Sequence, residues 1–144
     1  MQTFLPYPSF VESARVLDQA RLGKQRVETL QLLRANTVEG HGFRRHPAAR
    51  MWTEHLPGLV AYGIAITDEW IERGHADTVR PQLVAFAPEV EGVPQEDLEL
   101  PPWIGDEALH LSHRSNLVRK SPEVYRPIFG DIPDDLPYVW PVGK

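Results

Sequence analysis

Hydrophobic residues recur along this chain at helical spacing, and they predict three main helices. The first predicted helix covers residues 10–35, which contain no proline, with a break near Asp18. At about 100° per residue, Leu22, Leu30 and Leu33 fall on one side of it. This stripe is typical of a helix that packs on a core.

The second predicted helix begins at Met51 or His55 and ends at Arg73, where Gly74 is a suitable terminator. Its apolar and small residues repeat at helical spacing and predict a core stripe: Leu56, Leu59, Val60, Gly63, Ile64, Thr67, Trp70 and Ile71. The third predicted helix covers residues 106–120, with two acids at its amino-terminal end.

The segments between these helices have other patterns. Residues 36–47 predict a loop and residues 78–87 a short helix. Residues 88–102 are acidic with four prolines, which indicates an irregular surface connection. Residues 121–144 are rich in proline and aromatic residues, and we expect them to wrap over the helices rather than form a fourth. The expected fold is all-α, a compact single domain over residues 1–144 with about three main helices and an irregular carboxy-terminal segment.

Composition excludes several classes of protein. The chain has no cysteine, which excludes disulfides, thiolate metal sites and cysteine nucleophiles. A hydrophobic fraction of 42% and a charged fraction of 24% are those of a folded globular protein rather than a disordered one. No stretch approaches the roughly 20 apolar residues that cross a bilayer, and the first ten residues lack the pattern of a signal peptide. We therefore expect a cytoplasmic protein with no membrane partner.

The charge is unevenly distributed along the chain. The net charge of −5 argues against a nucleic-acid partner, since affinity for DNA comes largely from neutralised phosphates. However, residues 13–50 carry eight basic residues against three acids, whereas residues 89–107 carry seven acids and no base. Such asymmetry predicts a positive groove on an acidic body. Scattered solvated charges are the alternative.

One cluster on the first predicted helix is the best candidate for chemistry. Arg21, Lys24, Gln25 and Glu28 are spaced at i, i+3, i+4 and i+7, so they project side by side, opposite the leucine stripe. A carboxylate among cations can act as a base or stabilise a cationic intermediate, while the cations bind phosphates. A solvated helix face with ion pairs is the alternative.

A second grouping lies on the third predicted helix, where His110, His113 and Arg114 share one face. Two histidines at this spacing can ligate a metal, but no third ligand is evident, so the pattern favours anion binding and predicts no metal and no cofactor. Ordinary surface or capping histidines are the alternative.

Two further features suggest contacts with a nucleic acid. Arg44, Arg45 and His46 form a basic loop before a proline, which suits phosphate. Trp103 is a candidate platform for stacking a base, with a core position as the alternative. The standard phosphate-loop, dinucleotide, zinc-protease and serine-hydrolase motifs do not occur.

Several blocks of the sequence together resemble the pyrimidine-dimer DNA glycosylase (endonuclease V-like) family, especially its bacterial branch. They are Met1-Gln2-Thr3-Phe4-Leu5-Pro6, Leu17-Asp18, the run from Arg21 to Glu28, His46-Pro47, Glu69-Trp70, Arg73-Gly74-His75, the run from Pro102 to Glu107, Ser112-His113-Arg114 and Tyr138-Val139-Trp140-Pro141. The resemblance extends over nearly the whole chain.

This resemblance implies a compact bundle of about three helices that repairs DNA. Characterised members of the family cleave the glycosidic bond of a damaged pyrimidine through the amino-terminal α-amine. The amine forms a Schiff base with C1′ of the deoxyribose, a helical glutamate assists, and strand cleavage by β-elimination can follow. An α-amine has a pKa of about 8, so part of it is neutral and nucleophilic at pH 7.

Carried onto this chain, the resemblance makes Glu28 the assisting glutamate and Met1 the source of the amine, because the bulky Gln2 should block removal of Met1. Arg21, Lys24, Gln25 and Arg26 would bind the DNA backbone. His46, His113 and Arg114 would line the same cleft, and Arg45 and His110 are further candidates for nucleic-acid binding. The expected partner is duplex DNA with a damaged or modified base, which such enzymes reach by base flipping.

Two other functions stay open from the sequence. The first is a metal-independent enzyme that acts on a small nucleotide or modified nucleobase, which the acidic net charge favours. The second is a non-catalytic nucleic-acid-binding adaptor, for which substitution of Glu28 would change nothing.

Overall fold

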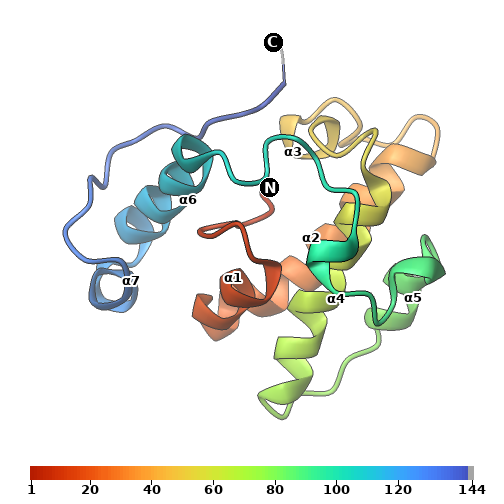
Figure 1. Ribbon diagram of the computed structural model, residues 1–144, viewed down its shortest axis with the longest axis horizontal. Helices are drawn as coiled ribbons and strands as arrows, with labels where there is room; N and C mark the ends of the chain where they lie inside the picture. The colour runs from red at the N-terminus through yellow and green to blue at the C-terminus, as the bar shows by residue number, and fades with distance from the viewer. Residues whose placement is uncertain (143–144) are drawn as a thin grey trace.

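A computed structural model describes residues 1–142, and this part of the chain is helical with no strand. The three longest helices are α2 (Gln19–Thr37), α4 (Leu56–Glu72) and α6 (Glu107–Lys120), as Figure 1 shows. The predicted all-α class and the three main helices are confirmed. None of the helices in the described part combines the length and apolar character needed to span a membrane.

The break predicted near Asp18 separates two helices. Helix α1 (Phe10–Val16) begins at Ser9, whose hydroxyl accepts a hydrogen bond from the Glu12 amide. The chain is extended at Leu17, and α2 begins after Asp18, whose carboxylate accepts from the Arg21 amide. Ser9 and Asp18 each cap a helix, because each side chain binds a backbone amide that the first turn of its helix leaves free. Two caps this close together account for two helices in place of one.

Helices α2 and α4 pack closely where small residues face the neighbouring element. A Cβ built on Gly63 of α4 would lie 2.8 Å from the Thr29 Cγ2 of α2 and 2.8 Å from the Leu83 Cδ1 of α5 (Arg80–Val84). Beside them α3 (Pro47–Arg50) brings Trp52 into the core, where it is fully buried. Helix α4 carries its proline, Pro57, in the first turn.

The acidic connection between α5 and α6 is irregular and mostly exposed, as the sequence predicted. It contains two short 3-10 helices, η1 (Pro88–Val90) and η2 (Gln95–Asp97). The side chain of Gln95 fixes this segment to the start of α1, since its Oε1 accepts from the Phe10 amide at 2.8 Å and its Nε2 donates to Pro8 O at 2.8 Å.

The expectation that the carboxy-terminal segment forms no fourth helix was wrong. Residues Pro122–Phe129 form α7, which begins with a proline in its first turn and is followed by Gly130. Tyr125 of α7 is fully buried, and its hydroxyl donates to the Asp18 carboxylate. This tertiary contact stabilises a helix too short to be evident from periodicity. Residues 130–142 are irregular, and the last two residues of the predicted tail lie outside the described part.

The first eight residues form an extended segment between two groups of helices. In Figure 1 this segment runs with α2 and α4 on one side and α6 and α7 on the other. Gln2, Thr3, Phe4, Leu5 and Pro6 are all buried. We call residues 1–8 the amino-terminal segment; it connects α6 to the rest of the protein and determines where residue 1 lies.

Candidate active site

The amino-terminal segment has no partner strand, so side chains of α2 and α4 bind its backbone. Gln25 bridges it with both ends of its amide: Nε2 donates to Gln2 O at 2.7 Å, and Oε1 accepts from the Phe4 amide at 3.0 Å. The hydroxyl of Tyr62 lies 2.8 Å from Phe4 O and 2.6 Å from Gln25 Oε1. Burial raises the pKa of Tyr62 well above its usual range, and the Glu28 charge adds to this effect.

Three side chains of α6 bind the other side of the segment. His113 Nδ1 accepts from the Leu5 amide at 2.9 Å, and His110 Nδ1 donates to Leu5 O at 2.8 Å. Arg114 donates to Pro6 O at 2.7 Å. These bonds assign the two histidines opposite tautomers, with the proton on Nε2 of His113 and on Nδ1 of His110.

Both α6 histidines are neutral groups of the interior. Burial lowers the pKa of His113 to about 3, and the neighbouring His110 lowers it further. Burial also lowers the pKa of His110, whose Nε2 accepts from the Gly105 amide at 2.9 Å. His110, His113 and Arg114 were predicted to bind nucleic acid. In this structure they bind the protein's own backbone. Among the described residues no cluster of three potential ligands could hold a metal ion.

A pocket of about 290 Å³ opens where the amino-terminal segment begins. It unites Met1 with four predicted residues of α2 and adds side chains from later in the chain. Its lining consists of Met1, Gln2, Phe4, Arg21, Lys24, Gln25, Glu28, Lys120 and Tyr138. The i, i+3, i+4, i+7 cluster of α2 therefore faces a concave site that also contains residue 1.

Glu28 is the carboxylate of this pocket, and its side chain is only 13% exposed. Its Oε2 lies 3.1 Å from Gln25 Nε2 and 3.5 Å from the Gln2 amide nitrogen, while its Oε1 lies 3.5 Å from Lys24 Nζ. The carboxylate thus lies within hydrogen-bonding range of the second residue of the chain, directly next to residue 1.

Three cations surround Glu28. Arg21 is held by Asp18 at 2.9 Å and by the Ser121 hydroxyl at 3.1 Å. Lys24 is largely exposed. Lys120 Nζ lies 5.2 Å from the centre of the Phe4 ring and donates to the Tyr138 hydroxyl at 3.2 Å. Burial lowers the pKa of Lys120, and so do its neighbours Arg21 and Arg119.

His46 lies close to the same charges, although it does not line the pocket. Burial lowers its pKa, the positive charge of the amino terminus lowers it further, and the Glu28 charge opposes both. Its Nδ1 accepts from the Ala48 amide at 3.0 Å at the start of α3, and Trp140 packs edge-on against the ring. His46 is therefore within electrostatic range of both the amino terminus and Glu28.

Residues 1–81 match the family model described as pyrimidine dimer DNA glycosylase, which is more than half of the chain. The chain belongs to this family. It is a family of DNA-repair glycosylases, whose partner is DNA. The matched part includes both Met1 and Glu28, whereas Lys120 and Tyr138 lie beyond it. Searches of curated proteins and of solved structures found no match to the chain.

Three further predicted residues of this glycosylase-family chain lie outside the pocket. Arg26 pairs with Asp77 and covers the Trp70 ring at 4.5 Å from its centre. Arg45 is exposed in the loop before α3. Trp103 is only 8% exposed and packs edge-on against Trp52 with ring centres 4.8 Å apart, so the core position left open by the sequence is the one observed.

Sequence reasoning missed three side chains of the site: Tyr62, Lys120 and Tyr138. Tyr62 lies in the apolar stripe of α4, and its single polar atom gives no signal in a hydrophobicity pattern. Lys120 follows the basic end of α6, and Tyr138 lies in the aromatic tail. Only the proximity of chain segments more than 90 residues apart identifies these two as parts of one pocket with Glu28.

Proposed function

We propose that this protein is a DNA glycosylase and abasic-site lyase that acts on damaged or modified pyrimidines through the α-amine of Met1, assisted by Glu28. Membership of the pyrimidine dimer DNA glycosylase family supports repair of DNA in general. The observation that carries the specific proposal is the anchoring of the amino-terminal segment, which brings residue 1 into the same pocket as a half-buried carboxylate.

Anchoring of this kind does more than stabilise the fold, because it fixes the position of the amino-terminal amine. An extended chain end normally frays, because few contacts compensate the conformational entropy that ordering costs. Here five side chains bind the backbone of residues 2–6: Gln25, Tyr62, His110, His113 and Arg114. A fixed amine is already oriented for attack, which lowers the entropic part of the activation barrier.

The proposed reaction uses groups that line the pocket. The neutral amine nitrogen attacks C1′ while the bond from C1′ to the damaged base breaks, and the proton lost by the amine goes to the departing base. Opening of the sugar ring, with a proton from solvent to O4′, gives a protonated imine. Glu28 then accepts a proton from C2′, the bond from C3′ to the 3′ phosphate oxygen breaks, and water hydrolyses the imine to free the amine.

The charges around Glu28 fit a substrate that carries phosphate. Arg21, Lys24 and Lys120 present three cations at the pocket although the whole chain carries −5. Cations at these positions neutralise backbone phosphates on both sides of a flipped nucleotide. Their density is the observation that favours DNA over a free nucleobase as the substrate.

Borohydride trapping tests the proposal. A duplex with one abasic site is incubated with the protein and reduced, and the covalent adduct is quantified for wild type, for protein with an acetylated amino terminus, and for Glu28→Gln. We expect wild type to form an adduct on Met1 and acetylation to abolish it. Glu28→Gln should slow strand cleavage by at least about 100-fold. Glu123→Gln, an exposed change on α7, is the matched control and should behave as wild type.

Each contrary outcome has a definite meaning. An adduct that survives acetylation excludes the α-amine as the nucleophile. Strand cleavage at the wild-type rate by Glu28→Gln excludes Glu28 from the reaction. If duplex affinity is weak and independent of salt, the substrate is not DNA, because binding through phosphates falls with salt concentration.

A further inference from the structure

A groove runs along one face of α4, away from the proposed active site. Its floor consists of α4 residues at helical spacing: Pro57, Gly58, Ala61, Ile64, Ala65, Asp68, Glu69 and Glu72. Three adjoining hollows form it: the central one shares Leu98 with the hollow at one end and Val11, Ala65 and Asp68 with the hollow at the other. We call this surface the α4 groove; over its 16 helical residues it is about 24 Å long.

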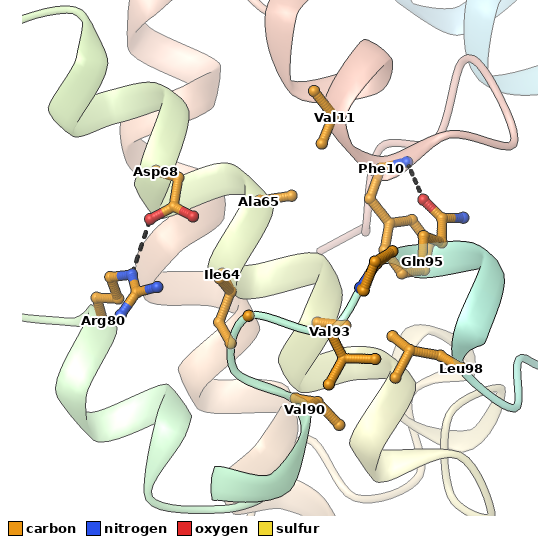
Figure 2. A pocket seen from close by; sticks show the side chains of 13 residues that line it. Phe10, Val11, Ile64, Ala65, Asp68, Arg80, Val90, Val93, Gln95 and Leu98 are labelled. Atoms are coloured by element: carbon orange, nitrogen blue, oxygen red, sulfur yellow. Dashed lines mark hydrogen bonds and ion pairs between the residues drawn. The ribbon is translucent and has the colours of Figure 1, made fainter.

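The central hollow has a volume of about 240 Å³ and mostly apolar walls (Figure 2). Figure 2 shows Phe10 and Val11 from α1 on one side and Val90, Val93 and Leu98 on the other. Val11 is 48% exposed and Val93 37% exposed, so apolar surface faces solvent at the mouth. The volume is below the roughly 300–1,000 Å³ of a site for a small organic ligand, and it suits one large apolar side chain.

The walls of the groove are fixed in place without any occupant. Gln95 joins one wall to the start of α1 through the Phe10 amide, and Arg80 joins it to α4 through ion pairs with Asp68 and Glu91. Figure 2 draws the hydrogen bond between Gln95 and Phe10 and the ion pair between Arg80 and Asp68. A preformed groove loses little entropy when a partner binds.

Carboxylates line both ends of the α4 groove. Six acids contribute to the three hollows against two bases, Arg15 and Arg80: Glu54, Glu89 and Glu99 at one end and Asp68, Glu69 and Glu72 at the other. Within residues 1–142, four of these acids form no ion pair: Glu54, Glu72, Glu89 and Glu99. This surface repels nucleic acid and attracts cations at both ends of an apolar centre.

We propose that the α4 groove is a docking site for a cationic segment of a partner protein. The segment inserts one large apolar side chain between Val11, Val93 and Leu98, and its Lys or Arg residues on either side pair with the free carboxylates at the two ends. This assignment is independent of the proposed catalytic reaction, because the groove and the Met1–Glu28 pocket share no lining residue.

Selection from a library of random peptides displayed on phage tests the proposal. The full-length protein is the target, and binders to Ala65→Arg are removed first, since an arginine at this half-buried position fills the groove and repels cations. We expect enriched sequences with one large apolar residue between basic residues. A synthetic peptide of that sequence should bind wild type more weakly as salt rises. It should bind Ala65→Arg at least about tenfold more weakly.

Matched variants make the outcome specific. Val124→Arg adds the same charge to an exposed apolar position of α7 and should bind the peptide as wild type does. Glu72→Lys and Glu99→Lys change exposed carboxylates at opposite ends of the groove, and each should weaken binding even if Ala65→Arg perturbs the fold. No enrichment, enrichment of neutral or acidic peptides, or equal binding to the groove variants would overturn the proposal. So would self-association that Ala65→Arg abolishes, since the occupant would then be a second copy.

Discussion

A few buried polar side chains determine the geometry at the amino terminus. Gln25, Tyr62, His110 and His113 are each at most 2% exposed, and each binds the backbone of residues 2–5. In a hydrophobic interior a backbone group without a partner costs about 1–3 kcal/mol, so these side chains replace the neighbouring strand that the segment lacks. They position residue 1 through the backbone, and of the four only Gln25 lines the pocket.

Tyr62→Phe tests this role at the scale of one atom. The change removes only the hydroxyl that lies 2.8 Å from Phe4 O and leaves that buried carbonyl without this partner. We expect the free energy of unfolding to fall by about 1–2 kcal/mol and the rate of borohydride trapping to fall as well, because the segment that carries Met1 loosens. Urea denaturation and trapping at pH 7 measure the two effects.

Tyr7→Phe is the control for this prediction. Tyr7 is half-buried in the same segment, and its hydroxyl makes no hydrogen bond within residues 1–142, so stability and trapping should both stay at the wild-type value. Equal stability of wild type and Tyr62→Phe would contradict the proposed role of the hydroxyl.

Helix α2 shows which structural features can be predicted from the hydrophobic pattern of a single helix. The leucine stripe was predicted to pack on the core, and Leu22, Leu30 and Leu33 are buried. The break before α2 follows from two local caps at Ser9 and Asp18. The opposite face was predicted as polar, yet Gln25 on that face is buried because the amino-terminal segment covers it. A helix buried on two sides has a weak amphipathic pattern, and no periodicity reveals its second contact.

The close approach of α2, α4 and α5 at Gly63 provides a test at the scale of elements. In Gly63→Ala the new Cβ meets the Thr29 and Leu83 side chains at 2.8 Å. Overpacking costs about 1–3 kcal/mol, which exceeds the gain of at most about 1 kcal/mol in helix propensity. We therefore expect a net loss of stability of about 1 kcal/mol and a lower Tm, measured by thermal unfolding.

Gly42→Ala is the matched control. A Cβ at Gly42 meets no atom within 4 Å, so its Tm should stay close to wild type. A Tm for Gly63→Ala at or above the wild-type value would contradict the prediction, since the helices would then accommodate the added methyl group without loss of stability.

On the scale of the whole molecule, the charges divide into two surfaces. The cations Arg21, Lys24 and Lys120 gather at the Met1–Glu28 pocket, whereas six acids, among them Glu89 and Glu99, line the α4 groove. The net charge of −5 is thus compatible with a local positive site, as the uneven distribution along the chain predicted. Of the two assignments, the first rests on a family match and the second on the shape and charge of the groove alone.

Acid should destabilise the whole fold through the neutral histidines of α6. Burial lowers the pKa of His113 from 6.5 to about 3, so between these values the unfolded chain binds a proton that the folded chain does not. Stability is therefore fully present above pH 6.5 and falls as the pH drops toward 3. At pH 5 His113 alone should reduce the free energy of unfolding by about 2 kcal/mol relative to pH 7.5. Urea denaturation at both values measures this loss.

The variant His113→Asn separates this effect from other titrations. Asn keeps an acceptor near the Leu5 amide but does not titrate, so the loss between pH 7.5 and pH 5 should shrink by about 2 kcal/mol even if the variant is less stable at both values. An unchanged pH dependence would mean that other groups cause it.

The sequence by itself determined the helical class, the three main helices, the break at Asp18 and the cluster of Arg21, Lys24, Gln25 and Glu28. These follow from spacing and caps, which act over a few residues. It left open whether Trp103 is a core residue, did not predict the burial of His110 and His113, and missed α7, because burial and hydrogen bonding to distant backbone decide those positions. Only the tertiary structure decided which face of α2 is covered and where residue 1 lies. The physical reason is that the polar groups of an extended segment find their partners on helices up to about 100 residues away, and no local pattern encodes that choice.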